Sequence, residues 1–122
     1  MDLQGKRYVV TGGSRGFGRA IVEALAAAGA FVMSAQRNAS DGIDHANVQN
    51  YSVDLRDRES IAGFCRQMPD SLNGLIGNAG LLGEICRIED GGEKIWLETQ
   101  LVNVAANYII LRHLRERLLA AG

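Results

Sequence analysis

The 122-residue sequence is poor in the residues that build disulfide frameworks and metal sites. Its two cysteines, Cys65 and Cys86, are too few and too far apart for a disulfide scaffold or a zinc site, and we expect both to be buried, reduced thiols. Its two histidines, His45 and His113, have no carboxylates or thiols near them at ligand spacing. We therefore expect no metal.

The chain also lacks a charge imbalance and a long apolar run. A formal net charge of −1 gives no electrostatic reason to expect nucleic acid or an anionic membrane as a partner. No apolar run approaches the roughly 20 residues that cross a bilayer, and Met1–Lys6 lacks the apolar segment of a signal peptide. The sequence thus predicts a cytoplasmic protein. Its length and 47% hydrophobic content fit one small globular domain over residues 1–122.

What the chain does have is a glycine-rich loop between an apolar strand and a helix. The strand Arg7–Thr11 leads into a Gly-x-x-x-Gly-x-Gly run at Gly12–Gly18, and a helical pattern follows at once. Glycines allow the backbone to turn sharply and to approach a ligand closely. The helix N-terminus offers unpaired N–H groups and partial positive charge. This junction predicts a nucleotide-phosphate site.

Strand and helix patterns alternate along the whole chain. The expected strands are Arg7–Thr11, Ala30–Ala35, Val48–Val53 and Leu72–Gly77. The expected helices are Arg15–Ala28, Arg58–Gln67 and about Glu93–Ala120, with at most a rudimentary helix within Arg37–Asn47. Such alternation indicates an α/β fold with a doubly wound parallel sheet, here half of one, in strand order 3-2-1-4. The fourth strand would lie at an edge.

The last predicted helix is apolar on most of its circumference, which is typical of a helix buried on two sides. We therefore expect a homo-oligomer that associates through Glu93–Ala120 or the fourth-strand edge. Trp96, Gln100, Asn103 and Asn107 align on one face of this helix. This row either consists of amides that bond to neighbouring backbone or water, or it faces the nucleotide cleft.

Four stretches together resemble the classical short-chain dehydrogenase/reductase family, in its order and spacing. They are Thr11–Gly18 (its Thr-Gly-x-x-x-Gly-x-Gly loop), Val53-Asp54-Leu55, Gly77-Asn78-Ala79-Gly80 and Val102-Asn103-Val104. The likeness covers nearly all of the chain and implies a Rossmann-like fold, nicotinamide cofactor binding and hydride transfer between alcohols and carbonyls.

The resemblance also implies site residues. The loop residues expected to bind the cofactor are Gly12, Ser14, Arg15, Gly16, Phe17 and Gly18, whose glycines would surround the pyrophosphate. Asp54 would accept from the adenine amino group, with the Leu55 backbone beside it. Asn78, Ala79 and Gly80 would line the ribose side. Gly77 departs from the family, which usually has asparagine there, and we expect a looser turn at this point.

Charge indicates the choice of cofactor. Family members that prefer NAD have a carboxylate at the end of the second strand, where this chain has Gln36 followed by Arg37. Arginine binds a 2′-phosphate with charge-assisted hydrogen bonds, and Arg15 is a second cation within reach. The sequence favours NADP(H) over NAD(H).

Of the family's catalytic tetrad the 122 residues contain only Asn103. Tyr108 and Arg112 have the spacing of Tyr-x-x-x-Lys, but a guanidinium does not deprotonate, and Tyr108 lies about 140° around the helix from Asn103. We expect the cofactor-binding portion of an NADP(H)-dependent oxidoreductase, inactive as this chain alone. The alternatives are a catalytically silent nucleotide-binding or association module, and a loop that holds no nucleotide because its cleft is open.

Overall fold

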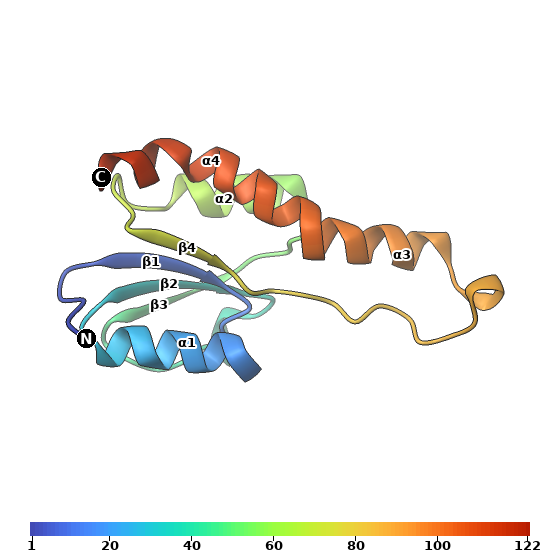
Figure 1. The fold of residues 1–122 in the computed structure, drawn as a ribbon, viewed down its shortest axis with the longest axis horizontal. Coiled ribbons are helices and arrows are strands. Elements are labelled where there is room, and N and C mark those ends of the chain that lie inside the picture. Colours follow the sequence, from blue (N-terminus) through green and yellow to red (C-terminus); the bar gives the residue numbers. More distant parts are fainter.

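The computed structural model describes residues 1–122, and its centre is a parallel sheet of four strands in the order β3-β2-β1-β4 (Figure 1). The strands are β1 (Arg7–Thr11), β2 (Phe31–Gln36), β3 (Val48–Ser52) and β4 (Gly74–Gly77). The predicted strand order is confirmed. β4 begins later than predicted because the backbone N–H of Leu72 donates to Arg117 of the last helix rather than to the sheet.

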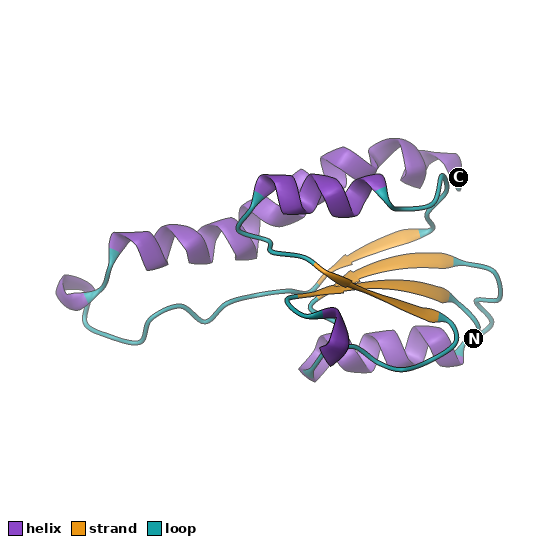
Figure 2. Ribbon diagram, turned by 180° about the vertical axis from the view of Figure 1, so that it is seen from behind, coloured by secondary structure: helices purple, strands orange, loops and turns teal.

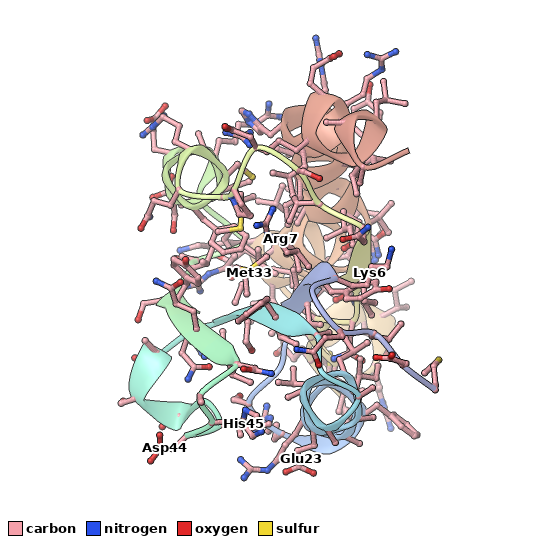
Figure 3. All side chains as sticks on the ribbon, turned by 90° about the vertical axis from the view of Figure 1, so that its left-hand side faces the viewer. Lys6, Arg7, Glu23, Met33, Asp44 and His45 are labelled. Atoms are coloured by element: carbon pink, nitrogen blue, oxygen red, sulfur yellow. The ribbon has the colours of Figure 1, made fainter.

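Helices cover both faces of the sheet, with α1 on one face and α2 and α4 on the other (Figures 1 and 3). Their bounds are α1 Gly16–Ala27, α2 Arg58–Arg66, α3 Glu93–Gln100 and α4 Ala106–Ala120, with short 3-10 helices at Ala39–Asp41 and Ile88–Asp90. Asp57 caps α2 by accepting from the N–H of Glu59. Gly29 follows α1 at a φ of 93°, a conformation that favours glycine.

Alternating side chains along each strand divide the core into two layers. Val9 and Met33 pack with α2 and α4, and Figure 3 shows Met33 on that side of the sheet. Val10 and Val32 point the other way and pack with Val22 of α1. The two-residue period of a strand thus produces a buried layer on each face, as a doubly wound sheet requires.

The predicted helix over Glu93–Ala120 forms, but a π-helical turn at Leu101–Ala105 divides it into α3 and α4. Val102, Ala106, Ile110 and Leu114 are buried at a spacing of four residues, whereas α3 has no buried residue. α3 and the segment before it project away from the sheet (Figures 1 and 2). The exposed apolar residues of this projecting part include Leu82, Ile85, Ile88, Ile95, Trp96 and Leu97, and those of the following helical turns include Val104, Tyr108 and Leu111.

The two cysteines differ in their surroundings. Cys65 is buried in α2, and this burial raises the pKa of its thiol to about 11. Cys86 is exposed on the projecting segment, so the prediction of a buried thiol is wrong for this residue. No helix has the length and apolar content needed to span a bilayer, and no cluster of histidine, cysteine and acidic side chains has the makings of a metal site.

Replacing Leu114 with alanine tests the packing of α4 on the sheet. The Leu114 side chain is fully buried, so Leu114→Ala should lower the free energy of unfolding by about 2–5 kcal/mol in urea titrations. Leu119→Ala removes the same atoms from a side chain of the same helix that is 58% exposed, and it should cost far less. Equal losses for the two variants would contradict this packing.

Candidate nucleotide-binding site

A cleft of about 680 Å³ runs across the carboxyl ends of all four strands. Its walls come from the loop after β1 (Gly12–Gly16), the end of β2 with residues 35–38, the segment 53–56 after β3, and the segment 78–81 after β4. The chain proceeds from β1 outward to β3 and then returns to β4 on the other side of β1. Such a reversal of strand order is where open α/β sheets bind ligands.

The glycine loop brings α1 close to the end of β1. A Cβ at Gly18 would lie 1.9 Å from the carbonyl oxygen of Gly12, so only glycine allows this approach. α1 begins at Gly16 without a capping side chain, and its first i-to-i−4 bond is from Arg19 to Arg15. The earlier N–H groups of this turn are therefore free of helical partners. Gly16 lines the cleft, and a Cβ there would meet no protein atom.

The turn after β4 is held tightly against the glycine loop. The buried Thr11 hydroxyl oxygen accepts from the backbone N–H of both Asn78 and Ala79, each at 3.1 Å. The side-chain amide of Asn78 donates to the carbonyl of Gly12, also at 3.1 Å. The looser turn expected at Gly77 is therefore not what the structure shows.

Asn107 of α4 occupies the space that a side chain at position 77 would need. A Cβ at Gly77 would lie 2.5 Å from the Asn107 side-chain oxygen. The amide nitrogen of Asn107 also donates to the carbonyl of Asn103 in the π-helical turn, at 3.4 Å. The absence of a side chain at Gly77 and the asparagine at 107 thus fit one another.

Two arginines in the cleft have no acidic partner. Arg15 lies in the glycine loop and Arg37 directly after β2, and neither forms an ion pair. Gln36 at the end of β2 also borders the cleft, but it is only 6% exposed because its side chain turns inward to Ser34 and Asn50. The positive charge at the end of β2 is therefore supplied by Arg37.

A third arginine in the cleft is paired. The Arg56 guanidinium and backbone N–H donate to the Asp54 carboxylate, and the side-chain contacts measure 3.0 and 3.2 Å. These hydrogen bonds hold the pKa of Asp54 below its ordinary value. A carboxylate offers about four lone-pair sites, so Asp54 can still accept from a ligand N–H.

Asn103 lies behind the cleft wall rather than in it. Its side-chain oxygen accepts from the Leu81 N–H at 2.7 Å, and its amide donates to the Leu81 carbonyl at 2.9 Å. Asn103 and Asn107 are thus bonded to backbone, which is the first of the two alternatives for the row on this helix. Trp96 and Gln100 are exposed, and Tyr108, at 65% exposure, does not line the cleft.

Most residues predicted from the sequence meet in this one cleft. Those that line it are Gly12, Ser14, Arg15, Gly16, Arg37, Asp54, Leu55, Asn78, Ala79 and Gly80. Phe17, Gly18 and Asn103 lie beside it, and Phe17 is largely exposed. The sequence reasoning did not assign to the site the polar residues Asn38, Asp41 and Arg56 or the apolar residues Leu81 and Val102. Asn38, Arg56 and Leu81 each directly follow a predicted residue, so following each strand further into its loop could have found them.

The geometry defines an α/β domain with a cleft at the carboxyl ends of its parallel strands, and comparison with known proteins gives the family. The family model for "short chain dehydrogenase" matches residues 6–122. The chain therefore belongs to the short-chain dehydrogenase family.

Two curated relatives illustrate the match. The chain is 31% identical to the short chain dehydrogenase tazN of Aspergillus terreus, over 100% of this chain and 30% of that protein. It is also 31% identical to the 3-oxoacyl-[acyl-carrier-protein] reductase FabG of Vibrio cholerae, over 85% of this chain and 47% of that protein. The chain thus spans less than half the length of either relative.

Two solved structures share the fold and contain NADP. The RhlG/NADP active-site complex of Pseudomonas aeruginosa aligns with a TM-score of 0.89 at 25% identity, covering 99% of this chain and 51% of that one. A metagenomic short-chain oxidoreductase in complex with NADP aligns at 0.87 and 26% identity, covering 97% of this chain and 58% of that one.

Substitutions at positions 77 and 107 test how the turn after β4 packs. Gly77→Ala should destabilise the chain by about 1–3 kcal/mol, because its new Cβ would collide with Asn107. Asn107→Gly in the same chain should remove most of that cost. Urea unfolding of both single variants and the double variant gives the coupling energy. A coupling energy near zero would show that the two positions do not share this space.

Proposed function

We propose that this chain binds NADP(H) and forms the cofactor-binding portion of a short-chain oxidoreductase. The observation that carries the proposal is one cleft that combines an uncapped helix N-terminus in a glycine loop with two unpaired arginines, Arg15 and Arg37. The free N–H groups of the helix N-terminus suit a pyrophosphate, and the two arginines suit the additional 2′-phosphate. The NADP complexes of structurally similar proteins support the same cofactor.

The order of the strands suggests how an extended dinucleotide would use the cleft. Asp54 and Leu55 follow β3, Arg37 follows β2, the glycine loop follows β1, and Asn78–Gly80 follow β4. An adenosine 2′-phosphate near Arg37 would therefore lie to one side of the glycine loop. The nicotinamide half would lie to the other side, near Ala79 and Gly80.

When bound, NADP(H) supplies a hydride, and these 122 residues bind and orient it. A carbonyl reductase of this family also needs a proton donor beside the carbonyl, which its Tyr-x-x-x-Lys pair provides. Tyr108 is unsuited to that role, because it lies outside the cleft and has Arg112 at the position of the lysine. We therefore propose that these residues provide cofactor binding and do not reduce a carbonyl by themselves.

Titration with NADPH and NADH, followed by nucleotide fluorescence, tests cofactor binding and its selectivity. The chain should bind NADPH in the micromolar range and NADH more weakly. Arg37→Ala should reduce NADPH affinity by about 10- to 100-fold, through loss of charge-assisted bonds, and should change NADH affinity little. Arg112→Ala, an exposed arginine outside the cleft, is the matched control.

Equal affinity for the two nucleotides, or an Arg37→Ala variant that loses both equally, would contradict the assigned selectivity. No measurable binding would favour the open-cleft alternative. Turnover of NADPH with a carbonyl substrate by the purified chain would contradict the proposed division between binding and chemistry.

Exposed apolar side chains on the final helix support a second role in association. Trp96 of α3 is 62% exposed, and Val104 and Tyr108 beyond it are similarly exposed. β4 also has a free edge, since it pairs with β1 alone. We propose that the chain forms a homo-oligomer through this helix or this edge.

Sedimentation at micromolar concentration should therefore show a species larger than the monomer. Trp96→Glu should weaken the oligomer if α3 is the interface, because it would place a carboxylate in an apolar contact. Glu93→Gln, on the same helix, is a control that leaves its apolar side chains in place. A monomer at all concentrations would refute the proposal.

A further inference from the structure

The side chains of Ser34, Gln36 and Asn50, which are buried or half-buried, form a chain of hydrogen bonds beside the cleft, the polar relay. The Ser34 hydroxyl donates to the Gln36 side-chain oxygen at 2.7 Å, and the Gln36 amide nitrogen donates to the Asn50 side-chain oxygen at 3.0 Å. The Asn50 amide nitrogen then donates to the carbonyl of Ile43 at 3.0 Å. Ser34 and Asn50 are paired across β2 and β3, so the register of the sheet assembles the relay.

Both ends of this relay are fitted against glycines. A Cβ at Gly13 would lie 2.1 Å from the Ser34 hydroxyl oxygen, and a Cβ at Gly42 would lie 2.0 Å from the Asn50 side-chain oxygen. Gly13 belongs to the glycine loop, and Gly42 belongs to the connection between β2 and β3. The relay therefore joins the two segments that hold the unpaired arginines of the cleft.

The connection of residues 37–47 contains only the short 3-10 helix Ala39–Asp41. Its single buried residue is Ile43, and the carbonyl of Ile43 accepts the hydrogen bond from the Asn50 amide. Ser52 of β3 makes a further tie by accepting from the N–H of Ala39 at 2.8 Å. Ile43 packs with Val22 and Val32, but the rest of the connection has no buried side chain, so hydrogen bonds from β3 do much of the work of positioning it. The same connection contributes Arg37, Asn38 and Asp41 to the cleft.

We propose that Asn50, which does not line the cleft, is a positioning residue for cofactor selection. It acts through Gln36 and Ile43 to fix the connection that presents Arg37 to the 2′-phosphate. The inference rests on the proposed NADP(H) binding. Gln36 borders the cleft but is only 6% exposed, with its side chain directed to Ser34 and Asn50, so the proposal assigns the contact with the 2′-phosphate to Arg37 and not to Gln36.

A carboxylate at position 36 would then act differently from one that faces a ribose. Gln36→Glu replaces the donor to Asn50 with an acceptor. If the Asn50 amide kept its orientation, two oxygens would face each other at position 36. If it rotated, its oxygen would face the Ile43 carbonyl instead. In either orientation two acceptor oxygens face each other with no hydrogen between them, which costs free energy. The variant should therefore weaken the hydrogen bonds that hold residues 37–47 in place.

The test uses adenosine 2′,5′-bisphosphate and AMP, which differ only in the 2′-phosphate, with binding measured by calorimetry. The wild-type chain should prefer the bisphosphate. Asn50→Ala should lower bisphosphate affinity about five- to tenfold, the factor expected for one buried hydrogen bond, with AMP affinity within about twofold of wild type. In a chain that already carries Arg37→Ala, adding Asn50→Ala should lower bisphosphate affinity little further, because both substitutions remove the same contact.

Asn73→Ala is the matched control, because the Asn73 side chain also ties backbone, accepting from the N–H of Arg7 at the opposite end of the sheet. It should leave the ratio of the two affinities unchanged. Hydrogen exchange of the unliganded chain is the second readout. Residues 37–47 should exchange faster in Asn50→Ala and in Gln36→Glu, but not in Asn73→Ala.

Different results would overturn the proposed function and the positioning role of Asn50. If the wild-type chain binds neither nucleotide, the proposed function and the selection role both fail. If it binds both and Asn50→Ala leaves their ratio unchanged, only the positioning role of Asn50 fails. A Gln36→Glu variant that prefers AMP and exchanges normally at residues 37–47 would also overturn the inference, since residue 36 would then read the ribose directly.

Discussion

The carbonyl of Gly12 is the point at which three parts of this chain converge. The first turn of α1 approaches it so closely that Gly18 has no room for a side chain, and the Asn78 amide of the turn after β4 donates to it. A Cβ at Gly12 itself would lie 2.9 Å from the Cα of Ala79. The end of β1, the start of α1 and the turn after β4 are therefore fixed relative to one another. Because the strand order reverses at β1, this junction also sets the floor of the cleft.

The charges of the cleft are arranged around that junction according to the order of the strands. Arg15 and Arg37 lie free on the loops after β1 and β2, whereas Arg56 after β3 is bound to Asp54. Pairing with Asp54 lowers the capacity of Arg56 to bind a phosphate, so Arg15 and Arg37 are the arginines of the cleft without an ion-pair partner. The segment after β3 instead carries paired charges. One sheet thus presents unpaired cations beside a segment of paired charges, and the proposed NADP(H) binding would place the 2′-phosphate at the former.

The order of the strands and most cleft residues could be predicted from the sequence, because strand and helix periods are local and the ends of parallel strands meet at one edge. The partners of these residues could not be predicted. The inward turn of Gln36 depends on the pairing of Ser34 with Asn50 across two strands, and the fit of Gly77 depends on Asn107 in a distant helix. Each is a tertiary contact between residues whose individual patterns are unremarkable. Such contacts are set by register and packing, which no single window of sequence contains.

The π-helical turn joins the cleft to the exposed apolar region of the chain. Val102 lines the cleft, and Asn103 in the same turn holds both backbone groups of Leu81, another cleft residue. Leu81 begins the segment that projects with α3. A partner that covers α3 would therefore restrict the segment that forms one wall of the cleft. By thermodynamic linkage, any change that association makes to nucleotide affinity must be matched by an equal effect of nucleotide on association. If the chain both binds nucleotide and associates as proposed, the two hydrogen bonds between Asn103 and Leu81 are the direct connection between the cleft and α3.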